Sequence, residues 1–351
     1  MNKKLIIFGG SFDPIHKGHL KIALKAFNKI KADKLFFVPC SQNHPTNKSI
    51  SASNEQRMDM IKLCIKKYPQ FEICDYEINN TNETSYTINT IRYIKNNYSN
   101  YDLYLLIGYD QLINFTSWKD YKEILEYCKL ICHIRKFEKQ QDVNVDFKYI
   151  KIGYFNIKTS SSDLKVYPNK KYLDSKVIKY INDNGLYAVD RLKLVMSDYR
   201  LQHCIDVANI AKNLAISHKL YPLINRAYVA GIYHDYAKDY KKEEQIKIAH
   251  HKLKYFDYPS WKVLHANVGA YEIEKKFFVD DYQVLTAIKN HTIPNDFSTL
   301  TKLIYIADKI APRHDNQGDK EVEKWVKMSK QDLDQCFRTI HEYYLDFNKG
   351  N

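Results

Sequence analysis

No stretch of this sequence is apolar for long enough to cross a membrane. The apolar run near the start, Leu5 to Phe8, is ended by Gly9 and Gly10, whereas a spanning helix needs roughly 18 to 20 apolar residues. The same short run is too brief for the apolar region of a secretory leader. We therefore expect Leu5 to Phe8 to form a first strand in a cytoplasmic protein with no membrane association.

Paired cysteines are also missing. The seven cysteines are an odd number, they are scattered along the chain, and none forms a Cys-x-x-Cys pair. The pattern therefore indicates neither a disulfide framework nor a thiolate zinc site. A reducing compartment suits such a chain.

Blocks of like charge are absent, although the chain is basic. Lysine and arginine number 54 against 41 aspartates and glutamates, which gives a formal net charge of +13. No run of five or six like charges occurs, and no internal repeat or low-complexity segment is present. Spread charge is typical of a solvated surface, so we favour that interpretation over a nucleic-acid interface.

What the sequence does contain is enough apolar material for two folded domains. It has 351 residues, of which 44% are hydrophobic and 27% charged, and this length favours at least two domains. The first half alternates short apolar runs with helical patterns. The expected strands are Leu5–Phe8, Leu35–Val38, Phe71–Asp75, Leu103–Ile107 and Leu130–Ile134, and the expected helices are Leu20–Ile30, Arg57–Ile65, Thr87–Lys95 and Tyr121–Tyr127.

This alternation predicts an α/β domain with a parallel, Rossmann-like sheet, in which ligands bind beyond the carboxyl ends of the strands. From about Arg191 the pattern becomes helical throughout, which predicts an all-α second domain. A glycine, Gly185, follows a helical stretch near the junction. We therefore expect a first domain over residues 1–188 and a second over 191–351.

The densest motif lies between the first strand and the first helix. It runs from Gly9 to His19 with the sequence GGSFDPIHKGH. Glycines there let backbone amides approach an anion, and a helix N-terminus adds unpaired N–H groups. His16 and His19 are three residues apart, so both imidazoles can face the same phosphate. The pattern predicts a phosphate-handling loop, although a tight turn with capping histidines explains either histidine taken alone.

The motif resembles the His-x-Gly-His loop of nucleotidyltransferases. Further motifs resemble those of bacterial nicotinate-nucleotide adenylyltransferases, which implies that nicotinate mononucleotide is the acceptor. These motifs are Ser85-Tyr86-Thr87-Ile88-Asn89-Thr90, Gly108-Tyr109-Asp110 with Trp118, Ile134-Arg135, and Thr159-Ser160-Ser161-Ser162-Asp163-Leu164-Lys165. The sequence departs from the family at Asn89, which replaces an aspartate, at Lys165, which replaces an arginine, and at Pro45 to Lys48, where the family has Pro-Pro-His-Lys.

The resemblance implies attack by the 5′-phosphate of the mononucleotide on the α-phosphorus of ATP, with Mg²⁺ accompanying the triphosphate. His16, His19 and Lys165 are the implied catalytic residues. Tyr86 and Thr87 would position the nicotinate, and Trp118 would stack on the pyridine ring or be an ordinary core aromatic. The implied substrate-binding residues are Gly9, Gly10, Ser11, Phe12, Lys48, Tyr86, Thr87, Gly108, Asp110, Trp118, Arg135, Ser160, Ser161 and Ser162.

The second half contains an ordered series of histidines and aspartates within helical patterns. The series consists of His203, His234, Asp235, His265, His291 and Asp308. Imidazoles and carboxylates are ligands for divalent metals that activate water, and a helical bundle can bring them together from distant positions. A single pair such as His234-Asp235 is weak evidence, and one buried histidine is usually only hydrogen-bonded core.

With its flanking residues, the series resembles the HD-superfamily metal phosphohydrolases, and most closely the subgroup that cleaves diadenosine tetraphosphate (Ap4A) to two ADP. The resemblance implies that His203, His234, Asp235 and Asp308 hold one metal, while His265 and His291 join Asp235 at a second. Such a ligand set suits iron, manganese or zinc better than magnesium alone. Asp235 is also an implied catalytic residue, and Lys238 is either a polyphosphate contact or a solvated lysine.

Two alternatives stay open at this point. The transferase could use another acceptor, such as nicotinamide mononucleotide, pantetheine phosphate or a sugar phosphate. The second domain could hydrolyse a different nucleotide or sense nucleotides without turnover. The sequence does not fix the oligomeric state.

Overall fold

The computed structural model describes residues 2–41, 50–80, 84–135, 145–312 and 319–349. The chain separates into two compact units, Met1–Val177 and Ile178–Asn351. The division falls within helix α8 (Ser175–Asp183). Each unit is described by itself.

The first unit is built on one six-stranded parallel sheet with strand order β3-β2-β1-β4-β5-β6. The strands are β1 (Lys3–Gly10), β2 (Lys34–Pro39), β3 (Phe71–Ile73), β4 (Tyr101–Gly108), β5 (Cys128–Arg135) and β6 (Tyr149–Phe155). The chain leaves β1 towards β2 on one side and returns to β4 on the other. In such sheets the crevice for a ligand lies where the strand order reverses, which here is the carboxyl end of β1 and β4.

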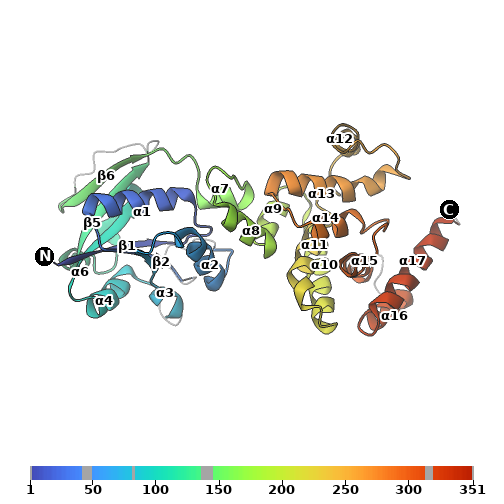
Figure 1. Ribbon diagram of the computed structural model, residues 1–351, viewed down its shortest axis with the longest axis horizontal. Coiled ribbons are helices and arrows are strands. Elements are labelled where there is room, and N and C mark those ends of the chain that lie inside the picture. Colours follow the sequence, from blue (N-terminus) through green and yellow to red (C-terminus); the bar gives the residue numbers. More distant parts are fainter. Residues whose placement is uncertain (1, 42–49, 81–83, 136–144, 313–318, 350–351) are drawn as a thin grey trace. The chain divides into compact units, whose positions relative to one another are not determined.

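Helices cover both faces of this sheet. They are α1 (Lys17–Ile30), α2 (Asn54–Ile65), α3 (Tyr76–Asn79), α4 (Thr87–Asn97), α5 (Tyr109–Ile113), α6 (Tyr121–Tyr127) and α7 (Ser161–Val166), with the 3₁₀ turn η1 (Phe115–Ser117). Figure 1 shows α1 on one side of the strands and α4 on the other. Leu5 and Ile7 of β1 pack in the core with α4 and α6, while Phe8 points to the opposite face and contacts His19 of α1. Both faces of β1 are therefore buried, as a central parallel strand requires.

The second unit is helical throughout its described residues. Its helices are α9 (Ala188–Leu192), α10 (Asp198–Ser217), α11 (Ile224–Tyr233), α12 (Lys242–Ile248), α13 (Leu264–Phe277), α14 (Tyr282–Lys289), α15 (Thr299–Ile310), α16 (Lys320–Ser329) and α17 (Leu333–Lys349). Short turns of helix lie between them at η2 (Tyr221–Leu223), η3 (Ala249–Leu253) and η4 (Trp261–Val263). One continuous core joins α10, α11, α13, α14, α15 and α17.

Helices α10 and α11 approach each other closely at Gly231. A Cβ built on Gly231 would lie 2.7 Å from the backbone Cα of Ala208. Only glycine therefore lets α11 lie directly on the backbone of α10. Because His203 is on α10 and His234 follows α11, this contact also brings the first predicted ligands together.

The predicted fold class is confirmed: a parallel α/β sheet followed by an all-α region. The sequence pattern missed strand β6, which has only partial burial along its length, and it missed the short helices α3 and α5. None of the seven cysteines forms a disulfide, and all seven are buried. No described helix is long and apolar enough to span a membrane.

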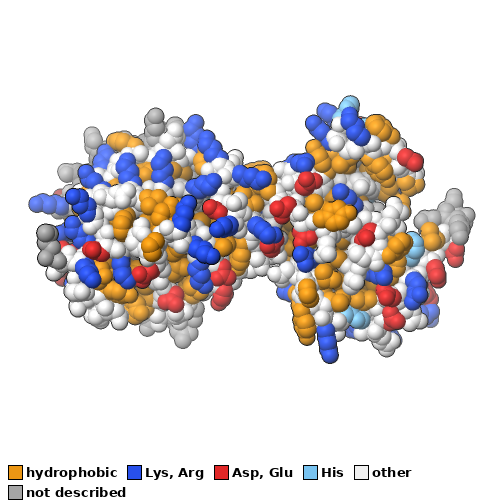
Figure 2. All heavy atoms as spheres, viewed as in Figure 1, with side chains coloured by type: hydrophobic (Ala, Val, Ile, Leu, Met, Phe, Trp, Pro, Cys, Tyr) orange, Lys and Arg blue, Asp and Glu red, His pale blue; other side chains and the backbone are white. Residues whose placement is uncertain are grey.

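Basic side chains are interspersed with acidic, apolar and uncharged ones on the face of the molecule that Figure 2 draws. Several lysines form ion pairs, for example Lys179 with Asp183 and Lys302 with Asp334. On this face the positive charge is thus spread rather than gathered into one block.

The Gly231 contact yields a prediction about stability. Gly231→Ala should lower the free energy of unfolding of the second unit by about 1–3 kcal/mol, because the added methyl group overpacks against the α10 backbone. Gly269→Ala on α13 is the matched control, since its Cβ would meet its nearest neighbour at 3.5 Å. Urea unfolding followed by circular dichroism measures both. Equal midpoints for the two variants would contradict the close packing.

Candidate active sites

The two histidines of the glycine-rich loop lie at the start of α1. His16 is the N-cap, and its Nδ1 accepts hydrogen bonds from the backbone N–H groups of Gly18 (3.0 Å) and His19 (3.4 Å). His19 Nδ1 in turn accepts from the N–H of His16 at 3.2 Å, and the two rings stack with centroids 3.8 Å apart. Because each Nδ1 is an acceptor, each neutral ring carries its proton on Nε2. That tautomer presents a donor suited to a phosphate oxygen.

Gly18 makes this arrangement possible. A Cβ on Gly18 would lie 2.7 Å from the ring of His16. A side chain there would push the imidazole away from the first turn of α1. The spacing His-x-Gly-His therefore has a structural cause: the glycine leaves room for the capping histidine.

The rest of the loop is anchored from below by Arg57 of α2. Its guanidinium is fully buried and donates to the backbone carbonyls of Ser11 (2.8 Å) and Cys40 (2.7 Å). Phe12 has a left-handed backbone (φ 48°), and its buried ring lies 5.2 Å from that of His19. A Cβ on Gly10 would press on the Phe12 ring at 3.0 Å, whereas one on Gly9 would meet no described atom within 4 Å. The described part of the protein thus leaves space beside Gly9.

Lys165, one of the implied catalytic residues, is buried beside the same loop. Its ammonium forms an ion pair with Asp13 and donates to Ser51 Oγ at 3.0 Å. Asp13 also accepts from the backbone N–H groups of Ser51 (2.8 Å) and Ala52 (3.2 Å). Lys165 is therefore fixed beside the loop by a buried carboxylate rather than extended into solvent.

The serine run at the start of α7 is brought to the first loop as well. Ser160 is the N-cap, and its hydroxyl accepts from the N–H of Asp163 at 3.1 Å. Ser161 Oγ donates to the carbonyl of Pro14 at 2.9 Å, while Ser162 is exposed. Two predicted phosphate-handling elements, separated by most of the first unit in sequence, thus lie together.

The start of α4 and the Trp118 segment also meet. Tyr86 is the N-cap of α4 and makes no side-chain cap hydrogen bond, so Thr87 begins the helix without one. The ammonium of Lys119 lies 4.4 Å from the centroid of the Tyr86 ring. Trp118, beside it in sequence, is half-buried and packs on Phe115 with ring centroids 5.3 Å apart. The contact brings Tyr86 and the Trp118 segment to one side of the unit.

Glu77 is buried and forms hydrogen bonds with residues at the start of α4. Its carboxylate is buried and accepts hydrogen bonds from the hydroxyls of Ser85 and Thr90, which flank Tyr86 and Thr87. Burial raises the pKa of Glu77, against the lowering effect of these hydroxyls. The sequence analysis missed this role of Glu77. The available signal is an acidic residue in a segment whose other residues have the spacing of a buried segment.

Gly108 ends β4 beside Asp110, which is exposed in the first turn of α5. A Cβ on Gly108 would collide with the carboxylate of Asp110 and lie 3.5 Å from His133 Nε2. Arg135 ends β5, but its side chain lies outside the described residues, as does Lys48. The described members of the predicted set therefore gather around the carboxyl ends of β1 and β4 and the starts of α1, α4 and α7.

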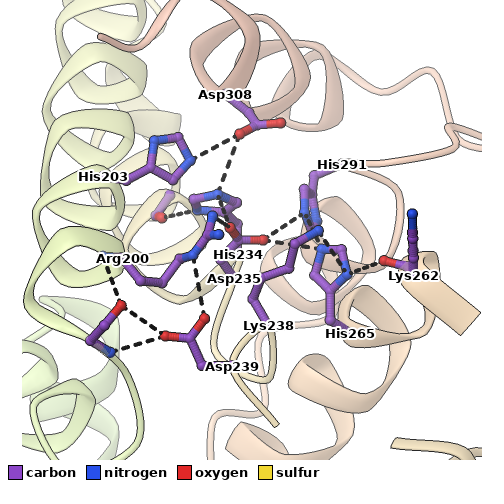
Figure 3. Close-up of polar contacts among 12 residues, drawn as sticks. Arg200, His203, His234, Asp235, Lys238, Asp239, Lys262, His265, His291 and Asp308 are labelled. Atoms are coloured by element: carbon purple, nitrogen blue, oxygen red, sulfur yellow. Dashed lines mark hydrogen bonds and ion pairs between the residues drawn. The ribbon is translucent and has the colours of Figure 1, made fainter. Parts of the chain in front are cut away.

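In the second unit, the predicted metal ligands converge from different helices (Figure 3). His203 lies on α10, His234 and Asp235 follow α11, His265 opens α13, His291 follows α14 and Asp308 is near the end of α15. None is more than 4% exposed. Such burial of imidazoles and carboxylates is costly unless each group has a partner.

These residues form two adjoining sets. In the first, Asp308 Oδ1 lies 3.1 Å from His203 Nε2 and 3.5 Å from His234 Nε2. In the second, Asp235 Oδ1 lies 3.1 Å from His265 Nε2 and 3.4 Å from His291 Nε2. The other oxygen of Asp235 lies 3.6 Å from His234 Nε2, so Asp235 faces both sets.

Three of the histidines are held in the form that binds metal. The Nδ1 atoms of His234, His265 and His291 lie 2.7, 2.9 and 2.7 Å from the carbonyls of Gly231, Lys262 and Ile288, respectively. Each Nδ1 must carry the proton to donate to a carbonyl, which leaves a lone pair on Nε2. His234 Nε2 is fully buried and has no hydrogen-bond partner among the described residues. The donor set therefore fits divalent metal ions.

The pKa shifts of Asp235 and His291 agree with a ligand role, whereas the nearby carboxylates outweigh burial and raise the pKa of His234. Burial acts to raise the pKa of Asp235, but the three surrounding imidazoles outweigh it and hold that pKa well below its usual value. Burial lowers the pKa of His291 to about 4. Asp235 is thus ionised and His291 neutral at neutral pH, the states in which they bind metal.

Cations surround the two sets. Arg200 donates to Asp235 Oδ2 at 2.7 Å, and Lys309 donates to Asp308 Oδ2 at 2.9 Å. Lys238 is half-buried near His265, and burial lowers its pKa. The sequence analysis assigned no role to Arg200 or Lys309. Lys309 is next to Asp308 in sequence, and Arg200 lies one helical turn before His203.

Known protein families match both parts of the chain. A cytidylyltransferase-like family matches residues 7–166, and the HD domain, a divalent-metal-binding domain, matches residues 200–313. Among solved structures, a predicted HD superfamily hydrolase involved in NAD metabolism from Clostridium acetobutylicum is 29% identical over 47% of this chain and 87% of its own, with a TM-score of 0.42. A Plasmodium falciparum nicotinic acid mononucleotide adenylyltransferase complexed with NaAD is 23% identical over 53% and 97%, with a TM-score of 0.45.

Two relatives match the whole chain. A Mycoplasma genitalium protein named probable nicotinate-nucleotide adenylyltransferase/Ap4A hydrolase is 40% identical over 99% of this chain and all of its own length. A Mycoplasma pneumoniae protein of the same name is 32% identical over 98% of this chain and all of its own. The chain therefore belongs to this two-domain family, in which a nucleotidyltransferase domain is joined to an HD domain.

Proposed function

We propose that this chain is a bifunctional enzyme of NAD biosynthesis and nucleotide hydrolysis. Its first domain transfers AMP from ATP to nicotinate mononucleotide, giving nicotinate adenine dinucleotide and pyrophosphate. Its second domain hydrolyses Ap4A to two ADP. The observation that carries the proposal is the identity with relatives of that name along the full length of both chains.

The geometry of the first site supports the transfer reaction. The reaction needs an in-line approach of two anions, so positioning and charge stabilisation are the main work of the protein. His16 and His19 carry Nε2–H donors at the start of α1, and these would hold the α- and β-phosphates. Mg²⁺ bound with ATP would supply further charge neutralisation.

Other residues of the first domain would hold the two ends of the substrates. Lys165 and Ser161 lie beside the loop, where they would contact the outer phosphates of ATP. The start of α4, at Tyr86 and Thr87, would hold the nicotinate end, with Trp118 against the pyridine ring. Lys165 supplies a point charge in place of a planar guanidinium, which costs bidentate contact but keeps the reaction type.

The geometry of the second site supports hydrolysis at a two-metal centre. His203, His234, Asp235 and Asp308 would hold one ion, and His265 and His291 would join Asp235 around the other. Bound ions of this kind lower the pKa of water and polarise the substrate phosphate. The mixed histidine and carboxylate set suits iron, manganese or zinc. Lys238, with its lowered pKa and half-buried ammonium, would offset the charge of the polyphosphate.

The transferase assignment predicts the effect of one substitution. His19→Ala should lower the rate of pyrophosphate release from ATP and nicotinate mononucleotide by at least about a hundredfold, because it removes a donor to the developing charge. His251→Ala, at an exposed histidine of the second unit, is the matched control. Full activity of His19→Ala would refute the assigned role, and faster turnover of nicotinamide mononucleotide would identify a different acceptor.

The hydrolase assignment predicts a separable loss. With Mn²⁺ or Fe²⁺, the chain should convert Ap4A to ADP alone, and His234→Gln should abolish this while leaving pyrophosphate release intact. Chromatography of the products measures the first reaction, and the retained transferase activity shows that the variant chain is folded. ATP plus AMP as products would mean asymmetric cleavage, and binding without any product would indicate a sensing module.

A further inference from the structure

Asp235 has to present its two oxygens in different directions. Oδ1 lies 3.1 Å from His265 Nε2 and 3.4 Å from His291 Nε2, while Oδ2 lies 3.6 Å from His234 Nε2. This split is what lets one carboxylate serve both histidine sets. The final torsion of an aspartate side chain is soft, and both oxygens turn together about it, so a hydrogen bond at Oδ2 helps to hold both oxygens in place.

Arg200 is the residue that holds Oδ2. Its NH1 group donates to this oxygen at 2.7 Å, and its side chain is only 22% exposed (Figure 3). A carboxylate oxygen has lone pairs for one such hydrogen bond and one metal ion. The contact with Arg200 is therefore compatible with metal binding at the same oxygen.

Arg200 is itself held in place. Its Nε lies 3.7 Å from Asp239 Oδ1, an ion-pair distance. Asp239 Oδ2 accepts from the N–H and the hydroxyl of Ser197, each at 3.0 Å. Ser197 is the N-cap of α10, so a chain of contacts runs from the start of this helix through Asp239 and Arg200 to Asp235.

Asp308 provides the internal comparison. Both histidines near it, His203 and His234, face the same oxygen, Oδ1. Its Oδ2 pairs with Lys309 and has no histidine contact among the described residues. Among the described residues, Asp308 thus faces one set through one oxygen, whereas Asp235 faces both sets through its two oxygens.

We propose that Arg200 is a positioning residue that orients Asp235 so that each carboxylate oxygen faces a different histidine set, and that this orientation makes the second metal position. The inference rests on the proposed two-metal function. Asp239 acts through Arg200 as its anchor. The guanidinium is required because one planar group must reach Asp235 and Asp239 together.

The test counts bound Mn²⁺ in the full-length chain. Arg200→Gln should retain one ion but bind the second about 10- to 100-fold more weakly, the usual cost of losing a group that orients a ligand. Asp239→Asn should weaken the second ion in the same direction by less, and Arg200→Lys should restore it in part. Arg226→Gln is the matched control, because Arg226 pairs with Asp281 at the same 2.7 Å yet touches no predicted ligand.

Equilibration against graded Mn²⁺ followed by elemental analysis gives the count, and pyrophosphate release by the first domain reports folding. If Arg200→Gln binds both ions as the unsubstituted chain does, the inference is wrong; a raised KM for Ap4A in that case would make Arg200 a substrate ligand. If the unsubstituted chain binds two ions but does not hydrolyse Ap4A, the proposed hydrolase function is wrong. The metal count in the variants still tests the role of Arg200 in that case.

Discussion

A charge taken out of water has to be compensated where it lies, and that constraint shapes both domains of this chain. In the first, the carboxylate of Asp13 is buried and is met by Lys165 and two backbone amides. In the second, Asp235 is buried among histidines and Arg200. Each compensation joins segments far apart in sequence, so satisfying the buried charge also assembles the site.

A buried charge that is compensated by backbone groups also fixes the conformation of the loop to which those groups belong. The guanidinium of Arg57 donates to the carbonyls of Ser11 and Cys40, which directly follow β1 and β2. The buried guanidinium therefore holds the glycine-rich loop in place. The backbone amides of the loop remain at the carboxyl edge of the sheet. The positive field there is suited to a triphosphate.

The sequence predicted the architecture well because its signals are local. Apolar runs such as Leu103 to Ile107 indicate a strand that is buried on both faces. The spacing of the histidines in the first loop indicates the turn that follows β1. Contacts between segments that are far apart in sequence could not be predicted in this way. Arg57, Glu77 and Arg200 act through a few specific contacts with other segments. Such contacts depend on the tertiary fold and leave no periodic pattern in the sequence. Strand β6 was missed because it is only partly buried.

The two sites use the same side chain in opposite tautomers, and the local backbone decides which. His16 caps a helix, where unpaired amides make its Nδ1 an acceptor and leave the proton on Nε2. His234, His265 and His291 each lie within hydrogen-bond distance of the carbonyl three residues before them, which makes Nδ1 the donor and leaves a lone pair on Nε2. A helix start thus produces an imidazole suited to an anion, and a preceding carbonyl produces one suited to a cation. The difference between binding a phosphate and binding a metal is therefore set by backbone position before any ligand arrives.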